Sequence, residues 1–203
     1  MGLTLSQTVK AVAVLLLLIA VTQPIYTALY IGAPDVSRQF LWGLEGLLFI
    51  LLIAFAGSAL AMAKRYALGF SAIAFGAALN VVQVGAGFTL FGPFGEAAEA
   101  NAELSGIAFS IVAFSFFVYN AAKILLGLAA LVFGAAVRNE DNKVLGGITA
   151  LVGAIAIVAN SVVMMFGLNG FFPSPIAGGS GVLATLLLAI CLFSLSKKDQ
   201  PFT

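Results

Sequence analysis

Lys123 is the residue of this chain whose position most needs a chemical explanation. It ends the segment FVYNAAK (residues 117–123), about halfway along an apolar run from Ile107 to Val137. An ammonium at the centre of a membrane-spanning helix costs about 2.5 to 3.5 kcal/mol on insertion scales, so such a lysine usually faces protein or water and has a partner. The position therefore favours a functional role for Lys123 over a purely structural one.

Three asparagines are predicted to lie at one depth in three different spans. At 1.5 Å per residue from the end of each span predicted to face outward, Asn80 lies at about 16 Å, Asn160 at about 18 Å and Asn120 at about 20 Å. Lys123 lies at about 24 Å on the same count. Its side chain leans toward its own N-terminus, so the ammonium can rise by about 6 Å into this layer. Tyr119 at i−4 and Asn120 at i−3 flank it on one helical face.

Glu45 is the other charged residue predicted well inside a span, away from the span ends, and it is the candidate counter-ion of Lys123. Its depth is only about 8 Å, which leaves a gap on the order of 10 Å, so a direct salt bridge is not expected. Gln23 and Gln83 lie at intermediate depth, about 12 Å. Together these side chains predict a polar vestibule that opens outward and narrows toward Lys123, above inner halves that are almost entirely apolar.

The predicted site is a binding site and not a catalytic one. The chain has no histidine and no carboxylate beside an intramembrane serine, so it lacks the nucleophile and base that a hydrolytic enzyme needs. The absence of histidine and the single Cys191 also exclude His-ligated haem and the usual His/Cys zinc or copper sites. No metal or cofactor is predicted. The predicted substrate-binding residues are Lys123, Asn120, Tyr119, Asn80, Asn160, Gln83 and Glu45.

Three functions are compatible with this set. The first is a small-solute transporter or channel-like protein that binds an anionic or zwitterionic group at Lys123. The second is a non-catalytic subunit or scaffold that packs against a partner membrane protein and offers Lys123 to a carboxylate of that partner. The third is a pocket for a lipid, quinone or pigment, which 18 phenylalanines support weakly. A lysine that points into its own bundle favours the first function, and one that points toward lipid favours the second.

Two further interpretations bear on single residues. Taken one by one, the buried amides are better explained as hydrogen bonds between helices than as ligand contacts. A lysine Schiff base with a retinal-type chromophore is disfavoured, because the chain has six predicted spans, the lysine lies in the fourth, and no aspartate is beside it.

The composition indicates an integral membrane protein. Hydrophobic residues make up 62% of the 203 residues and charged residues 8%, and the mean hydropathy is +1.15, so the chain is expected to live in the lipid bilayer of a cell membrane, most simply a bacterial inner membrane. Nine basic and eight acidic residues give a net charge of +1, which argues against nucleic acid as a partner. A homo-oligomer or a membrane-protein partner is left open.

The elements that must position the site are six apolar segments in one all-α domain, residues 1–203. The predicted spans are residues 9–30, 40–62, 67–91, 107–137, 144–172 and 176–195. The basic residues fall almost entirely on one side of this six-helix bundle, so the positive-inside rule predicts that both termini are cytoplasmic. The basic residues on that side are Lys10, Lys64, Arg65, Arg138, Lys143, Lys197 and Lys198, and the opposite side holds Arg38.

Two breaks in regular structure are predicted toward the outer side. Pro24 lies in the outer part of the first span, where the missing N–H group predicts a kink. The segment from Asn169 to Ser180 is uncharged and rich in glycine and proline. It is predicted either to dip back into the membrane over a cavity or to form an ordinary apolar loop.

The third and fifth spans show a faint internal repeat. A displacement of 77 residues aligns Leu68 with Leu145, Gly69 with Gly146, Gly76 with Gly153, and Gln83 with Asn160. The small residues among them are ordinary positions for close helix packing.

Overall fold

The computed structural model describes residues 2–33, 36–167, 174–197 and 202. The described residues form six helices that are long and apolar enough to cross a membrane, so the chain is an all-helical, multi-pass membrane protein. The elements are α1 (Leu5–Gly32), α2 (Gln39–Met62), α3 (Ala67–Ala100), the short 3-10 helix η1 (Ala102–Leu104), α4 (Ser105–Glu140), α5 (Lys143–Phe166) and α6 (Ser174–Leu195).

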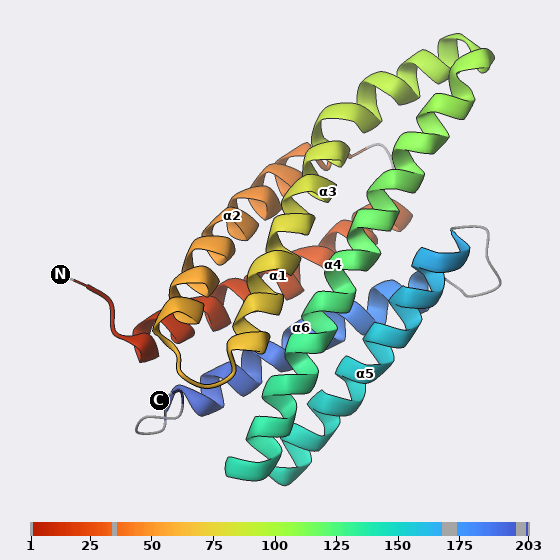
Figure 1. The fold of residues 1–203 in the computed structure, drawn as a ribbon. Coiled ribbons are helices and arrows are strands. Elements are labelled where there is room, and N and C mark those ends of the chain that lie inside the picture. The colour runs from red at the N-terminus through yellow and green to blue at the C-terminus, as the bar shows by residue number, and fades with distance from the viewer. Residues whose placement is uncertain (1, 34–35, 168–173, 198–201, 203) are drawn as a thin grey trace.

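The six helices form a ring in chain order. Each helix packs on its neighbours in sequence, α6 closes the ring against α1, and α4 additionally contacts α6. Both ends of the chain lie at one end of the bundle, hereafter the near end, and the hairpin between α3 and α4 lies at the opposite, far end (Figure 1).

The α3–α4 hairpin is longer than the rest of the bundle. At 1.5 Å per residue, the 34 residues of α3 and the 36 residues of α4 are about 50 Å long, against a hydrocarbon core of about 30 Å. Figure 1 shows both helices extending past the other four at the far end. The predicted end of the third span at Phe91 was therefore too early. The alanine- and glutamate-rich segment that ends at Ala100 continues the helix through Pro93 because its residues are strong helix formers.

The boundaries of α5 and α6 also differ from the prediction. α5 ends at Phe166, whereas the predicted span ran to residue 172. Residues 168–173 of the predicted loop lie outside the described part of the chain. From Ser174 onward the segment is the first part of α6, so a non-helical re-entrant loop is wrong for residues 174–180.

Glycines bring α3 and α5 against opposite sides of α4. A Cβ added at Gly69 or Gly76 of α3 would meet the Phe133 ring or the Ala122 carbonyl of α4. On α5, a Cβ at Gly153 would lie 2.6 Å from the Gly127 carbonyl oxygen, and Gly146 approaches the α4 backbone as closely. The glycines aligned by the 77-residue displacement thus have the same structural role in α3 and α5. Each lets its own helix pack closely on α4.

The near-end half of the bundle has an apolar core, as the sequence predicts. Phe70 and Phe133 are fully buried there, and their rings lie 5.0 Å apart. Phe202 is also buried. Its carbonyl accepts hydrogen bonds from the backbone N–H groups of Lys64 and Arg65, which ties the segment after α6 to the loop between α2 and α3.

Tyr66 lies at the near-end rim, directly before α3. Its hydroxyl donates to Glu140, and Glu140 also pairs with Arg65 at 2.6 Å. Burial of the phenol, together with its hydrogen bond to Glu140 and the negative charge of that carboxylate, raises the pKa of Tyr66 to about 12. The rim therefore links the loop before α3 to the end of α4.

We expect Gly146→Ala to destabilise the bundle and Gly147→Ala to leave it intact. The added Cβ at Gly146 would lie 2.5 Å from the Gly134 carbonyl oxygen, and such overpacking costs about 1 to 3 kcal/mol. The next glycine has no atom within 4 Å of the same added carbon, so its variant gains only helix propensity, about 0.5 to 1 kcal/mol. Thermal unfolding of both variants in one detergent measures this, and equal melting temperatures would contradict the packing described for α4 and α5.

Candidate binding site at Lys123

Lys123 is fully buried inside the bundle, near the middle of α4. Its Nζ donates a hydrogen bond of 2.7 Å to Oε1 of Gln23 on α1. The acceptor is a neutral amide, so this bond gives the ammonium a partner without neutralising its charge.

The Lys123–Gln23 hydrogen bond crosses the centre of the ring. Within the described residues, α1 packs on α2 and α6 but has no close backbone contact with α4. Two long side chains therefore bridge helices that do not pack on each other at this level. The interior here is filled by flexible polar side chains, which can change rotamer more easily than packed backbones can move apart.

Tyr119 of α4 and Gly181 of α6 also contact the side chain of Lys123. Its Nζ lies 5.1 Å from the centroid of the Tyr119 ring, one helical turn away, within the range of a cation–π interaction. The prediction that Tyr119 flanks the lysine is confirmed. On the α6 side, a Cβ added at Gly181 would lie 2.7 Å from Cδ of Lys123. The stem of the lysine thus occupies space that only glycine leaves open.

Glu45 is buried on α2 but does not pair with Lys123. Its Oε1 accepts a hydrogen bond of 2.7 Å from the hydroxyl of Thr22 on α1. No ion pair between Glu45 and Lys123 is present among the described contacts, as their predicted depths implied. Thr22 and Gln23 are adjacent on α1, so one short segment of α1 contacts both buried charges.

The three asparagines share one local geometry. Asn80, Asn120 and Asn160 each donate a hydrogen bond from Nδ2 to the backbone carbonyl four residues earlier. Asn160 also donates to the Ala177 carbonyl of α6 at 3.1 Å, which is the interhelical role expected of a buried amide. The Oδ1 atoms of Asn80 and Asn160 are buried without a hydrogen-bond partner. Each is an acceptor available to a polar ligand or to water.

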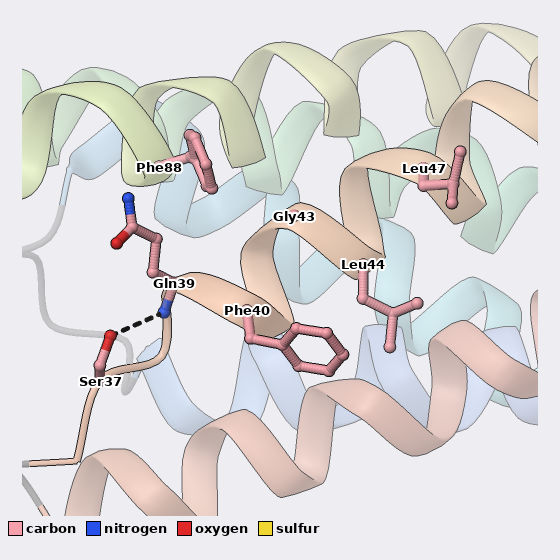
Figure 2. Close-up of a pocket in the computed structure, with 7 residues that line it drawn as sticks. All are labelled: Ser37, Gln39, Phe40, Gly43, Leu44, Leu47 and Phe88. Carbon is pink, nitrogen blue, oxygen red and sulfur yellow. Dashed lines mark hydrogen bonds between the residues drawn. The ribbon is translucent and has the colours of Figure 1, made fainter.

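The remaining predicted residue, Gln83, lies apart from Lys123 and contacts Ser115 of α4 at 3.4 Å. Asn120 lines a pocket of about 180 Å³ between the far-end halves of α4 and α5, together with Phe116 and Met164 among others. A larger surface groove of about 580 Å³ lies at the start of α2, where Phe40, Leu44 and Leu47 project from the helix and Phe88 of α3 lies beside Gly43 (Figure 2). Neither pocket reaches Lys123, so the outward vestibule stays a prediction.

Gln23 and Gly181 are the site residues that sequence reasoning did not include in the binding set. The depth count placed Gln23 in the vestibule, but nothing in the sequence pairs it with a lysine 100 positions away. The signal that was available is its depth, which is intermediate between those of Glu45 and Lys123. No feature of the sequence distinguishes Gly181 from the other glycines near it, so its contact with Lys123 could not be predicted.

No protein-family model, no curated protein and no solved structure matches the chain. The site geometry therefore carries the functional argument. Its chemistry is that of a buried cation beside an aromatic ring and a neutral acceptor, with a carboxylate nearby that hydrogen-bonds elsewhere.

We expect that removing Lys123 does not lower the free energy of unfolding. Removing Gln23 should lower it, but only in a protein that still contains Lys123. Gln23→Leu removes the acceptor of a buried ammonium and should cost about 1 to 3 kcal/mol. Lys123→Met should be neutral or stabilising, because a buried charge is replaced by an apolar side chain of similar length. The double variant should therefore recover the stability lost in Gln23→Leu.

The measurement is a double-mutant cycle of the free energy of unfolding, or of melting temperature, in one detergent. A loss of more than about 2 kcal/mol in Lys123→Met would show that the lysine is a structural element of the bundle, in the way that breaking a required buried pair does.

Proposed function

We propose that the protein is a small-solute transporter of the cell membrane and that Lys123 binds an anionic or zwitterionic group of the solute. In this proposal the far end of the bundle faces outward and both termini are cytoplasmic, as the distribution of basic residues predicts. The closed packing around Lys123 then corresponds to an occluded conformation, in which the site is shut from both sides of the membrane.

The observation that carries the proposal is that the buried amine of Lys123 has no carboxylate among its described contacts. Its ammonium is fully buried, and its described hydrogen-bond partner is the neutral side chain of Gln23. A buried ammonium is expensive unless it is paired with an opposite charge. An ammonium has three N–H donors, and the carboxylate or phosphate of a solute would supply both the missing charge and further acceptors.

The surroundings of Lys123 also supply groups for the rest of a solute. The Tyr119 ring is an apolar and π-rich wall beside the ammonium. Glu45 is also buried, and among its described contacts it hydrogen-bonds only to the hydroxyl of Thr22, the residue next to Gln23. A zwitterion would place its carboxylate at Lys123 and its ammonium toward Glu45, so the pair favours amino-acid-like solutes over simple anions.

The burial of Lys123 weighs against the alternative of a subunit that offers this lysine to a partner protein. A lysine reserved for a partner's carboxylate would lie on the lipid-facing surface, whereas this one is enclosed by α1, α4 and α6. The far-end projection of α3 and α4 is a feature that favours contact with another protein, but it does not involve Lys123. A lipid, quinone or pigment would use the apolar pockets described above and not the buried ammonium.

The test is stabilisation of the purified protein by four probes, namely acetate, phosphate, glycine and glutamate. A probe at 100 times its Kd adds about 2.7 kcal/mol to the stability of the protein that binds it. We expect at least one probe, with glycine or glutamate ahead of acetate, to raise the melting temperature of the wild type and not of Lys123→Met. Lys143→Met is the matched control, because it removes an exposed lysine at the start of α5.

Uptake of the stabilising probe into proteoliposomes then separates a transporter from a subunit that only binds it. The proposal is wrong if none of the four probes shifts the wild type, or if the shift is the same in Lys123→Met. A shift that disappears in both lysine variants would point to a general effect of net charge and would equally contradict a site at Lys123.

A further inference from the structure

We infer that the far-end halves of α1 and α6 are the gate of the Lys123 site, and that the first two turns of α6, residues 174–181, are its moving part. The inference deepens the proposed function, since it assigns the route by which a solute reaches Lys123. Three independent features of the described residues support it. The first turns of α6 contact Lys123, the same segment has a low helix propensity, and α1 and α6 are held together by a described hydrogen bond at the near end but by none at the far end.

The first turns of α6 lie directly on the site. Gly181 packs against the stem of Lys123, and a Cβ added at Gly178 would lie 3.6 Å from the Tyr119 hydroxyl. One turn away, the Ala177 carbonyl accepts the hydrogen bond from Asn160 of α5. Movement of this one segment would therefore uncover the lysine and its aromatic neighbour, and would also release the second donor hydrogen of the amide.

The same segment is the least favourable part of α6 for a helix. It contains Gly178, Gly179 and Gly181, and each glycine in a helix interior costs about 0.5 to 1 kcal/mol relative to alanine. Thr185 donates its hydroxyl to the Gly181 carbonyl at 2.8 Å, a bond that tends to bend a helix. Beyond Thr185 the helix is apolar, and Leu188, Leu192 and Leu195 are fully buried. The composition thus divides α6 into a weak far-end half and a firmly packed near-end half.

The adjoining helix α1 has its own weak point at the same level. Pro24 lies inside α1 and directly follows Gln23, the acceptor of Lys123. Proline removes one helical hydrogen bond, so the far-end part of α1 can pivot there. α1 and α6 are also the two helices that close the ring.

The two helices are fastened to each other at the near end. Ser6, at the start of α1, donates its hydroxyl to the Ser196 carbonyl just after α6 at 2.9 Å. Phe202 packs into the near-end core as well. With the near ends held in this way, local opening is easiest at the far ends, which is the side from which the proposal brings the solute.

The experiment uses alanine substitutions that change helix propensity without changing packing. Gly179 has no atom within 4 Å of an added Cβ, and the carbon added at Gly178 makes an ordinary contact. Gly57→Ala in α2 and Gly147→Ala in α5 are matched controls, because an added Cβ meets nothing within 4 Å at either position. All four glycines lie inside helices, so the gain in helix propensity is comparable.

Two readouts are taken without any solute: hydrogen exchange of the amides in residues 174–181, and acylation of the native Lys123 amine by a water-soluble amine-reactive ester, located by mass spectrometry. If the α6 segment is the gate, Gly179→Ala should slow both by about fivefold and the Gly178→Ala/Gly179→Ala double variant by about 20-fold. The controls should change neither rate.

Each remaining outcome overturns the gate. Slower exchange with unchanged acylation would mean that Lys123 is reached by another route. No slowing beyond the controls would mean that the segment does not open, and a wild-type lysine that never reacts would mean that the site has no opening on this time scale. Because solute is absent from both readouts, these results are separate from the probe-stabilisation test. Failure of that test would contradict solute binding at Lys123 but would not contradict the gate.

Discussion

The burial of the Lys123 amine inside a membrane-spanning bundle is the constraint that the arrangement of its polar groups has to meet. Lys123 is enclosed at a level where the ring of helices is bridged by side chains, and its hydrogen bond to Gln23 is made without a neutralising carboxylate. Such a charge can stay inside only if the surrounding helices hold polar atoms at that depth and keep lipid away. Gln23, Glu45, Asn120 and Asn160, which are buried on α1, α2, α4 and α5, supply polar atoms on the far-end side of the bundle.

The position of Lys123 follows from how closely its helix is packed. α4 is contacted by α3, α5 and α6, and glycines on all three partners remove the side chains that would otherwise hold them away. Close packing fixes the backbone of α4, while the centre of the ring is left to the long side chains of Lys123 and Gln23. A rigid frame around a deformable polar centre is the arrangement expected of a binding site that must both exclude water and admit a ligand.

The two ends of the bundle also differ in how firmly they are packed. The near end is closed by buried phenylalanines, by the contact of Phe202 and by the group of Arg65, Tyr66 and Glu140. The far end holds a proline in α1 and three glycines in the first turns of α6. This difference in composition predicts lower local stability at the far end, and segments of low local stability are where conformational change is generally found.

Much of this architecture could be predicted from the sequence because it depends on local composition. Uninterrupted apolar runs located all six helices, and the isolated charge of Lys123 identified the residue that needed an explanation. Helical spacing was also enough to place Tyr119 beside it.

What depended on helix packing could not be predicted. Gln23 is the partner of Lys123 only because α1 and α4 face each other across the ring, which no local pattern encodes. The asparagines lie in the expected helices but turn their amides to their own backbones, since a carbonyl one turn away competes with any distant ligand. The end of α3 was misjudged because Gly92, Pro93 and Gly95 resemble a loop, while helix-forming residues after them continue the helix.

The central claim is that the ammonium at position 123 binds the solute, and chemical rescue tests it most directly. In a Lys123→Cys, Cys191→Ser protein, alkylation of the introduced thiol by bromoethylamine forms a C–S bond, releases bromide and restores an ammonium on a side chain close to lysine in length. The account predicts that the probe which stabilises the wild type has no effect on the melting temperature before alkylation and regains its effect afterwards. A folded protein whose thiol is alkylated but which remains indifferent to every probe that stabilises the wild type would contradict the claim.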